Sequence, residues 1–168
     1  MLTLNVDLAS LEDTGRLGGV LAEALVRHNP GALLLYGELG AGKTTLARML
    51  VEALPGGCDA EISSPSFTIC NIYCTAPQVH HFDLYRLDSS YSGEELEESL
   101  DSAAVLTIIE WPERLATHAL PRDGIACALA LCNAVDNTGV RRAALTPLGP
   151  GGEYCLSLIA PMYPQQRG

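Results

Sequence analysis

The sequence predicts an α/β fold, with a central, mainly parallel sheet flanked by helices and antiparallel strands added in the C-terminal third. Three observations support this class. The apolar run ALLLY, residues 32–36, leads into a glycine-rich turn and then a helical pattern. A second run, VLTIIE at 105–110, is apolar and rich in β-branched residues, as buried strands are. Beyond Pro121 the chain changes to short apolar segments separated by turns, which is typical of antiparallel strands.

The N-terminal elements have recognisable boundaries. LTLNV at 2–6 alternates and predicts a short strand. Ser10 with Asp13 three residues later has a capping-box pattern, and apolar residues at helical spacing extend this helix to about His28. Asn-Pro-Gly at 29–31 ends it. A second helix follows the glycine turn and is ended by Pro-Gly-Gly at 55–57.

The remaining elements follow from the same patterns. FTICNIY (67–73) and VHHFD (79–83) predict strands, and GEELEESLDS (93–102) predicts a short acidic helix. The last third predicts three further strands with no helix between them, at 124–132, 140–148 and 153–160. DNTG at 136–139 falls in a predicted hairpin turn. We expect a single domain over residues 1–160 and a loose C-terminal tail at 161–168.

Composition limits the function classes. The 168 residues carry a net charge of −10 and a sequence pI near 4.7. This balance argues against a protein that grips nucleic acid on its own, because phosphate binding needs a basic face, so we expect no DNA binding. It shows neither a signal-peptide pattern nor the ~20 apolar residues of a membrane span, so we expect a cytoplasmic protein without membrane contact. The six cysteines lack zinc spacing and CxxC pairs; reduced thiols are expected, with disulfides as the alternative.

The stretch GELGAGKTT, residues 37–45, contains the single lysine of the chain. Gly37-x4-Gly42-Lys43-Thr44 matches the phosphate-loop pattern, in which backbone N–H groups and the following helix N-terminus face phosphate oxygens. Lys43 is expected to reach the β- and γ-phosphates of a nucleoside triphosphate, and Thr44 to offer its hydroxyl to Mg²⁺. The predicted nucleotide contacts in this P-loop are Leu39, Gly40, Ala41, Gly42, Lys43, Thr44 and Thr45.

Two carboxylates end predicted strands: Asp83 and Glu110. Ligands of open α/β sheets bind beyond the carboxyl ends of strands, so both acids are expected to face Mg²⁺ or the attacking water. Helix capping is the alternative for either acid alone. Ser66 and Thr68 resemble switch hydroxyls that sense the γ-phosphate, although loop capping also accounts for them. Thr14 either lines an adenine pocket or caps its helix.

Three kinds of nucleotide protein share such a loop. A GTPase needs an Asn-Lys-x-Asp element, which a chain with no second lysine lacks. A stand-alone small-molecule kinase needs an arginine-rich lid, whereas Arg141 and Arg142 lie in a predicted strand; the kinase is disfavoured and stays open. A nucleotide-gated binding module with negligible hydrolysis is a further alternative to an ATPase.

The segments GELGAGKTTLAR, SPSFT, HFDLYRL, EELE and IIEWPERL stand in the order and approximate spacing of the TsaE family. The chain resembles this family, the bacterial ATPase of tRNA threonylcarbamoyladenosine biosynthesis, over roughly residues 8–122. The resemblance implies a P-loop protein that binds ATP and hydrolyses it slowly alone. It also implies TsaD and TsaB partners, which modify the N6 of adenosine 37 and are reset by ATP hydrolysis, so that tRNA is met only through the complex.

The resemblance also implies residue roles. Lys43 matches the phosphate lysine, Thr44 and Glu110 the magnesium ligands, and Asp83 an acid that orients water or supports the metal. Trp111 is implied to lie beside the nucleotide, and Ser66 occupies the switch position, usually threonine. Ile72 departs from the family, which often has glutamate there.

Other polar side chains receive plainer interpretations. His80 and His81 lie on opposite faces of a predicted strand, and His81 matches the family motif. Neither has metal-ligand company, so hydrogen-bonded strand histidines are expected. The acidic helix is expected to be a solvated face, with docking on a basic partner as the alternative. Its glutamates are Glu94, Glu95, Glu97 and Glu98.

Overall fold

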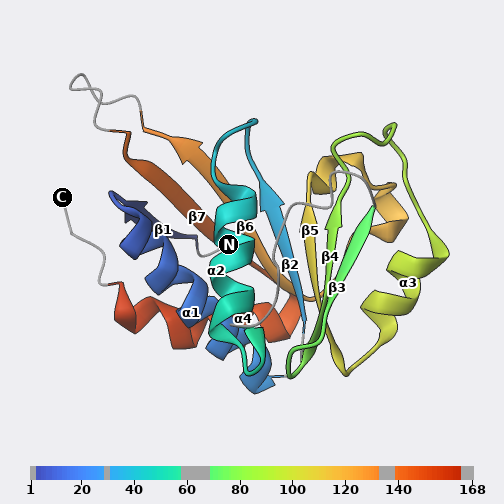
Figure 1. The fold of residues 1–168 in the computed structure, drawn as a ribbon, viewed down its shortest axis with the longest axis horizontal. Coiled ribbons are helices and arrows are strands. Elements are labelled where there is room, and N and C mark those ends of the chain that lie inside the picture. Colours follow the sequence, from blue (N-terminus) through green and yellow to red (C-terminus); the bar gives the residue numbers. More distant parts are fainter. Residues whose placement is uncertain (1–2, 29–30, 58–68, 133–138, 164–168) are drawn as a thin grey trace.

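The structure, a computed structural model, describes residues 3–28, 31–57, 69–132 and 139–163 (Figure 1). Its strands join one seven-stranded sheet in the order β1-β7-β6-β2-β5-β4-β3. The strands are β1 Leu4–Leu8, β2 Ala32–Tyr36, β3 Cys70–Tyr73, β4 Gln78–Asp83, β5 Val105–Glu110, β6 Gly124–Leu131 and β7 Arg141–Leu148. The α-helices are α1 Leu11–His28, α2 Lys43–Ala53, α3 Glu94–Asp101 and α4 Gly149–Ile159, and the short 3₁₀ turns are η2 Pro112–Arg114, η3 Thr117–Ala119 and η4 Ala160–Met162.

The centre of the sheet is parallel. β2 pairs in parallel with β5 on one side and β6 on the other, and β4 pairs in parallel with β5. β3, β7 and β1 pair antiparallel with their neighbours. The predicted class is confirmed, with one refinement: β6, expected among the antiparallel strands, belongs to the parallel centre. The carboxyl ends of β2, β4 and β5 therefore meet at one edge, where ligands of such sheets bind.

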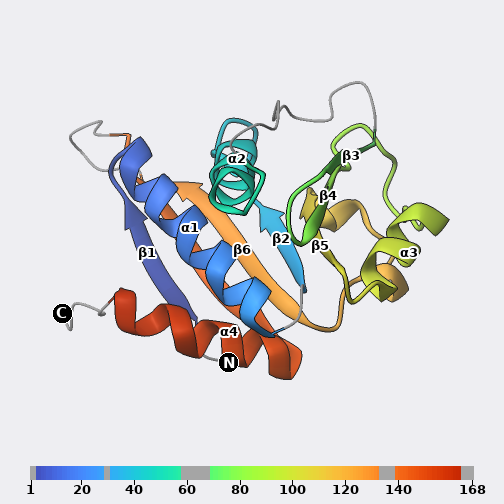
Figure 2. The same ribbon diagram turned by 60° about the horizontal axis from the view of Figure 1, so that its bottom comes forward.

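Helices lie on both faces of the sheet. α1 packs against α2 and α4 on one face, as Figure 2 shows. α3 packs on β5 from the other side, where Phe82 and Ile109 meet Leu96 in a separate apolar cluster. Alternation along a strand then places His81, Asp83 and Glu110 on the α2 face. The register thus positions polar side chains under the start of α2.

The start of α1 is fixed by the predicted capping box. The backbone N–H of Asp13 donates to Ser10 Oγ (3.1 Å), and Asp13 Oδ2 accepts from the backbone N–H of Ala9 (3.1 Å). These bonds satisfy N–H groups that the helix itself leaves unpaired. The predicted helix start is confirmed.

The predicted strand over 153–160 is wrong: these residues belong to α4 and its end. The buried positions of α4 include Gly152, Cys155, Leu156 and Ile159, spaced as i, i+3, i+4 and i+7. That spacing is helical, and the helix packs against β7 and α1. The Gly-Pro-Gly-Gly at its start suggests a turn in the sequence, although proline is well accommodated in the first turn of a helix.

Some expectations fall on residues outside the described ranges, namely Ser66, Thr68 and most of the DNTG turn. The division into a domain over 1–160 and a tail stays a prediction. The five cysteines within the described ranges are free thiols. Among the described helices, none combines the length and apolarity needed to cross a membrane.

Candidate functional site

The glycine loop between β2 and α2 has the backbone that its sequence predicts. Gly37 and Gly42 have φ angles of +138° and +103°, values that side chains disfavour. A Cβ at Gly37 would lie 2.3 Å from the carbonyl oxygen of Leu129, so no larger residue fits there without a backbone shift. Gly42 is the N-cap residue of α2, and no side chain caps the helix. The first N–H groups of α2 are left for another acceptor, and an anion is favoured there.

Lys43 is held inside this loop and is 4% exposed. Its Nζ donates to the carbonyl oxygens of Gly37 (2.6 Å) and Glu38 (3.0 Å) and lies 3.7 Å from the centre of the Trp111 ring. Burial lowers the pKa of Lys43, and nearby carboxylates, Glu110 first, oppose that shift. The ammonium is therefore positioned by carbonyl groups and an aromatic face.

Glu110 is the centre of a buried polar chain. Its Oε2 accepts from the Thr44 hydroxyl (3.0 Å), and its Oε1 accepts from Nε2 of His81 (2.9 Å). Glu110 is 2% exposed and His81 is fully buried. The chain joins three elements: the first turn of α2, the end of β5 and the middle of β4. A carboxylate taken out of water is held with both oxygens hydrogen-bonded, as its burial requires.

Asp83 lies opposite Glu110 in the parallel register of β4 and β5, so both side chains share a face. Asp83 is half buried, and its Oδ1 accepts from the backbone N–H of Tyr85 (3.1 Å). The Tyr85 ring lies 4.9 Å from the Trp111 ring, centre to centre. Trp111 has φ +61°, a strained value for a bulky residue, and its ring covers Lys43.

The structure brings most predicted site residues together. The loop residues, Lys43, Thr44, Glu110 and Trp111 form one cluster, with Asp83 beside it. Leu39 projects from the loop at 73% exposure. Thr14 is buried, and its hydroxyl donates to the carbonyl oxygen of Ser10 one turn earlier (3.2 Å), a bond within α1 that does not cap the helix; a place for Thr14 in an adenine pocket stays a prediction. Ile72 is half exposed on β3.

Sequence reasoning missed the part that His81 plays. The expectation of a hydrogen-bonded strand histidine is met, but its partner is the carboxylate at the centre of the site. The alternation of side chains along a strand could have indicated part of this: His81 precedes Asp83 by two residues, so the two share a face. Placing Glu110 on the same face requires the parallel pairing of β4 with β5, which the sequence does not show.

The donor set fits a magnesium–nucleotide complex. Mg²⁺ prefers oxygen ligands and is usually bound by one or two carboxylates together with substrate phosphates. Thr44 and Glu110 offer a hydroxyl and a carboxylate whose oxygens lie 3.0 Å apart. Within the described ranges no cluster of three or more His, Cys, Asp or Glu side chains could hold a metal by itself. A metal here would therefore depend on phosphate oxygens and water for its remaining ligands.

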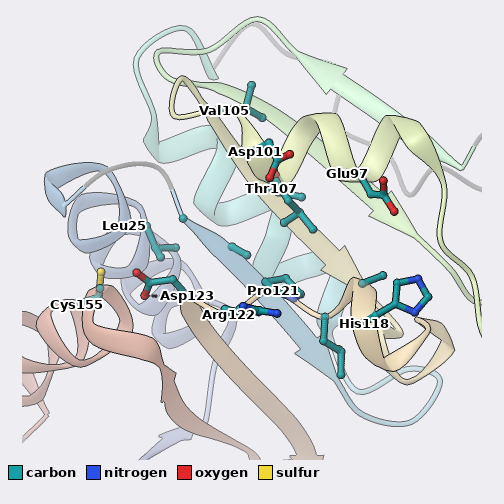
Figure 3. Close-up of a pocket in the computed structure, with 17 residues that line it drawn as sticks. Leu25, Glu97, Asp101, Val105, Thr107, His118, Pro121, Arg122, Asp123 and Cys155 are labelled. Atoms are coloured by element: carbon teal, nitrogen blue, oxygen red, sulfur yellow. Dashed lines mark hydrogen bonds between the residues drawn. The ribbon is translucent and has the colours of Figure 1, made fainter.

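A separate cavity of about 540 Å³ lies at the opposite, amino ends of the parallel strands (Figure 3). Ala32, Val105 and Gly124, which begin β2, β5 and β6, line it. Ionisable side chains surround it: Glu97, Asp101, His118, Arg122 and Asp123. Asp123 Oδ1 accepts from the backbone N–H groups of Gly124 and Gly152 (2.9 Å each), which makes it part of the framework. No predicted site residue lines this cavity.

Comparisons with known proteins agree on one family. The family model "Threonylcarbamoyl adenosine biosynthesis protein TsaE" matches residues 8–139. A tRNA threonylcarbamoyladenosine biosynthesis protein TsaE from Synechocystis is 39% identical over 113 residues, 64% of this chain and 69% of the relative. Its counterpart from Rickettsia felis is 38% identical over 116 residues, 67% of this chain and 63% of the relative. These alignments span about two thirds of the relatives' lengths.

A solved structure extends the likeness beyond those alignments. The crystal structure of Bacillus subtilis YdiB superposes with a TM-score of 0.71 at 27% identity, covering 94% of this chain and 95% of YdiB. The shared architecture therefore includes the C-terminal part.

Proposed function

This chain belongs to the TsaE family, and from that membership we propose that it is the ATP-hydrolysing component of tRNA threonylcarbamoyladenosine biosynthesis. ATP and Mg²⁺ bind at the loop edge of the sheet. Hydrolysis supports or resets a complex with TsaD-like and TsaB-like proteins, and the protein meets tRNA only through that complex. A net charge of −10 suits this indirect role, because a protein that grips tRNA by itself needs a basic face.

One observation carries the proposal: the hydrogen bond between Thr44 and Glu110, beside the buried ammonium of Lys43. A hydroxyl from the first turn of α2 and a carboxylate from the end of β5 converge where the uncapped helix start favours an anion. A chance glycine turn explains none of these features. They fit a nucleotide whose phosphates and metal are bound side by side.

Each residue of the site is assigned a role in hydrolysis from its position. Loop N–H groups and Lys43 bind the phosphates, and Thr44 and Glu110 hold Mg²⁺. Bound Mg²⁺ neutralises charge on the phosphate oxygens. Asp83, on the same face as Glu110, orients the attacking water or supports the metal. Trp111 holds Lys43 through its ring face and borders the nucleotide. The remaining loop residues complete the phosphate site, and we propose Ser66 as the switch hydroxyl from its sequence position alone.

The test is ATP hydrolysis by the purified protein, alone and mixed with TsaB and TsaD from the same organism. We expect a slow basal rate that rises on mixing and is absent in Lys43→Ala, whose loop retains its glycines. A rate indifferent to those partners would contradict the proposal. Consumption of ATP only with a small-molecule acceptor would favour the kinase alternative instead.

A further inference from the structure

His81 is the one histidine of β4 that faces the candidate site. Its side chain is fully buried, and Nε2 donates to Glu110 Oε1 at 2.9 Å. The other oxygen of that carboxylate accepts from Thr44. The neighbouring His80 lies on the opposite face of the strand, where its Nε2 is 3.0 Å from Gln78 Oε1. The two adjacent histidines thus differ in whether they reach the carboxylate.

The hydrogen bond from His81 matters because it fixes the Glu110 side chain. Without it, the rotatable bonds of the glutamate would let the carboxylate turn towards the Lys43 ammonium. Burial lowers the pKa of Lys43, and Glu110 is close enough to oppose that shift. Yet the ion pairs within the described ranges do not include Lys43 with Glu110. Glu110 is held instead by His81 and Thr44, and Lys43 by the loop carbonyls. The cation and the carboxylate are kept apart for separate tasks.

A role in packing alone explains His81 poorly. Its Nδ1 is buried and has no hydrogen-bond partner among the described residues. A buried polar atom without a partner destabilises a fold by about 1–3 kcal/mol. An apolar side chain of similar volume would avoid that cost. The imidazole is favoured at this position by the bond that its other nitrogen makes.

We propose that His81 is a positioning residue that anchors Oε1 of Glu110, so that Oε2 is presented beside the Thr44 hydroxyl to bind magnesium. This inference rests on the proposed function of the site. The anchor is built into the sheet, since the β4–β5 register pairs Asp83 with Glu110 and places His81 two residues behind on the same face. The protein's own side chains therefore orient the carboxylate.

The variants His81→Leu and His81→Gln test the inference, with His80→Leu as the matched control. Leucine removes the donor, whereas the amide nitrogen of glutamine can reach about as far as Nε2 and donate in its place. Two quantities are measured. Titration of the emission of Trp111, the chain's single tryptophan, gives ATP affinity at a series of Mg²⁺ concentrations, and steady-state assays give kcat and KM.

Removing a group that orients a metal ligand typically costs about 10–100-fold in metal affinity or activity, and we expect His81→Leu to fall in this range. The Mg²⁺ concentration for half-maximal effect should rise and kcat should fall, while ATP binding without Mg²⁺ stays near wild type. His81→Gln should recover most of the loss, and His80→Leu should behave as wild type. Thermal unfolding checks that each variant is folded; if His81→Leu is not, His81→Asn, too short to reach Glu110, replaces it.

Two results would overturn the inference. One is wild-type Mg²⁺ dependence and kcat in a folded His81→Leu. The other is equal loss in His81→Gln and His81→Leu, which a packing role predicts. A wild-type protein that shows no Mg²⁺-dependent ATP binding would instead overturn the proposed function itself.

Discussion

The two ends of the parallel strands hold their polar side chains differently. At the carboxyl ends, Lys43, His81 and Glu110 are buried, and each is hydrogen-bonded. At the amino ends, the charged side chains around the cavity, such as Glu97 and Arg122, are exposed to solvent. Buried charges are costly unless they are well partnered, so a fold keeps them where a task requires them. What distinguishes the carboxyl ends is the burial and hydrogen bonding of ionisable side chains, which the charged side chains around the cavity at the amino ends do not share.

Lys43→Ala should produce the largest effect. Within the protein the Lys43 ammonium donates to the carbonyl oxygens of Gly37 and Glu38, and the substitution removes its proposed charge-assisted hydrogen bond to a phosphate oxygen. Since one such bond contributes about 1.5–3 kcal/mol and 1.4 kcal/mol is tenfold, ATP affinity should fall at least ~10–100-fold. Calorimetric titration with ATP and Mg²⁺ measures this. Arg122→Ala removes a cation at the amino ends of the strands and should leave ATP affinity unchanged. Equal losses of ATP affinity in both variants would contradict the contrast between the two ends of the sheet.

Glu110→Gln comes next in size. The amide keeps the shape of the side chain but loses the negative charge proposed to bind Mg²⁺. We expect hydrolysis to fall by about 100-fold, as when a transition-state-stabilising group is lost. ATP binding without Mg²⁺ should persist, because the loop and Lys43 are untouched. Glu97→Gln, beside the amino-end cavity, is the matched control, and an undiminished rate in Glu110→Gln would contradict the assignment.

How far the sequence predicts this site depends on the range of the contact. The P-loop is local: its glycines, Lys43 and Thr44 are neighbours in the chain, and their spacing was sufficient. Asp83 and Glu110 were expected from a general rule about strand ends. The link from His81 to Glu110 joins positions 29 residues apart and depends on which strands pair. A single sequence does not show which strands are paired in the sheet.

The C-terminal third shows the same limit for the fold. The apolar run in residues 153–160 suggested a strand, although its buried positions recur at helical spacing. A short apolar run is compatible with a strand or with a helix, and the helix is stabilised here by packing against α1 and β7. The turn-like Gly-Pro-Gly-Gly, which is the first turn of α4, favoured the wrong choice.

A thiol-reactivity experiment sharpens the contrast at the amino ends. Cys155 lines the cavity but is only 2% exposed. Burial, and to a lesser extent the nearby charge of Asp123, raises the pKa of the Cys155 thiol to about 11. A raised pKa keeps the thiol protonated, so only about one in a thousand is the reactive thiolate at pH 8. Exposed Cys74 should therefore be alkylated by iodoacetamide well before Cys155, with the Cys155 rate rising as pH approaches 11. Peptide mass spectrometry follows both; equal rates at pH 8 would show an open, reactive cavity.

The smallest effect is expected for Asp101→Asn on the cavity rim. The side chain is exposed and distant from the loop, so the free energy of unfolding should change by no more than about 0.5 kcal/mol. Urea unfolding and an ATP titration measure the two consequences. A clear loss of ATP affinity would mean that the two ends are coupled.

The most direct test of the central claim, that nucleotide binds at the loop edge, is the emission of Trp111 during titration with ATP and Mg²⁺. This single tryptophan lies 3.7 Å from the Lys43 ammonium, so phosphate binding should alter its surroundings. We predict a saturable change that depends on Mg²⁺ and is lost in Lys43→Ala. ATP binding detected by calorimetry without any change in Trp111 emission would place the nucleotide elsewhere and contradict the account.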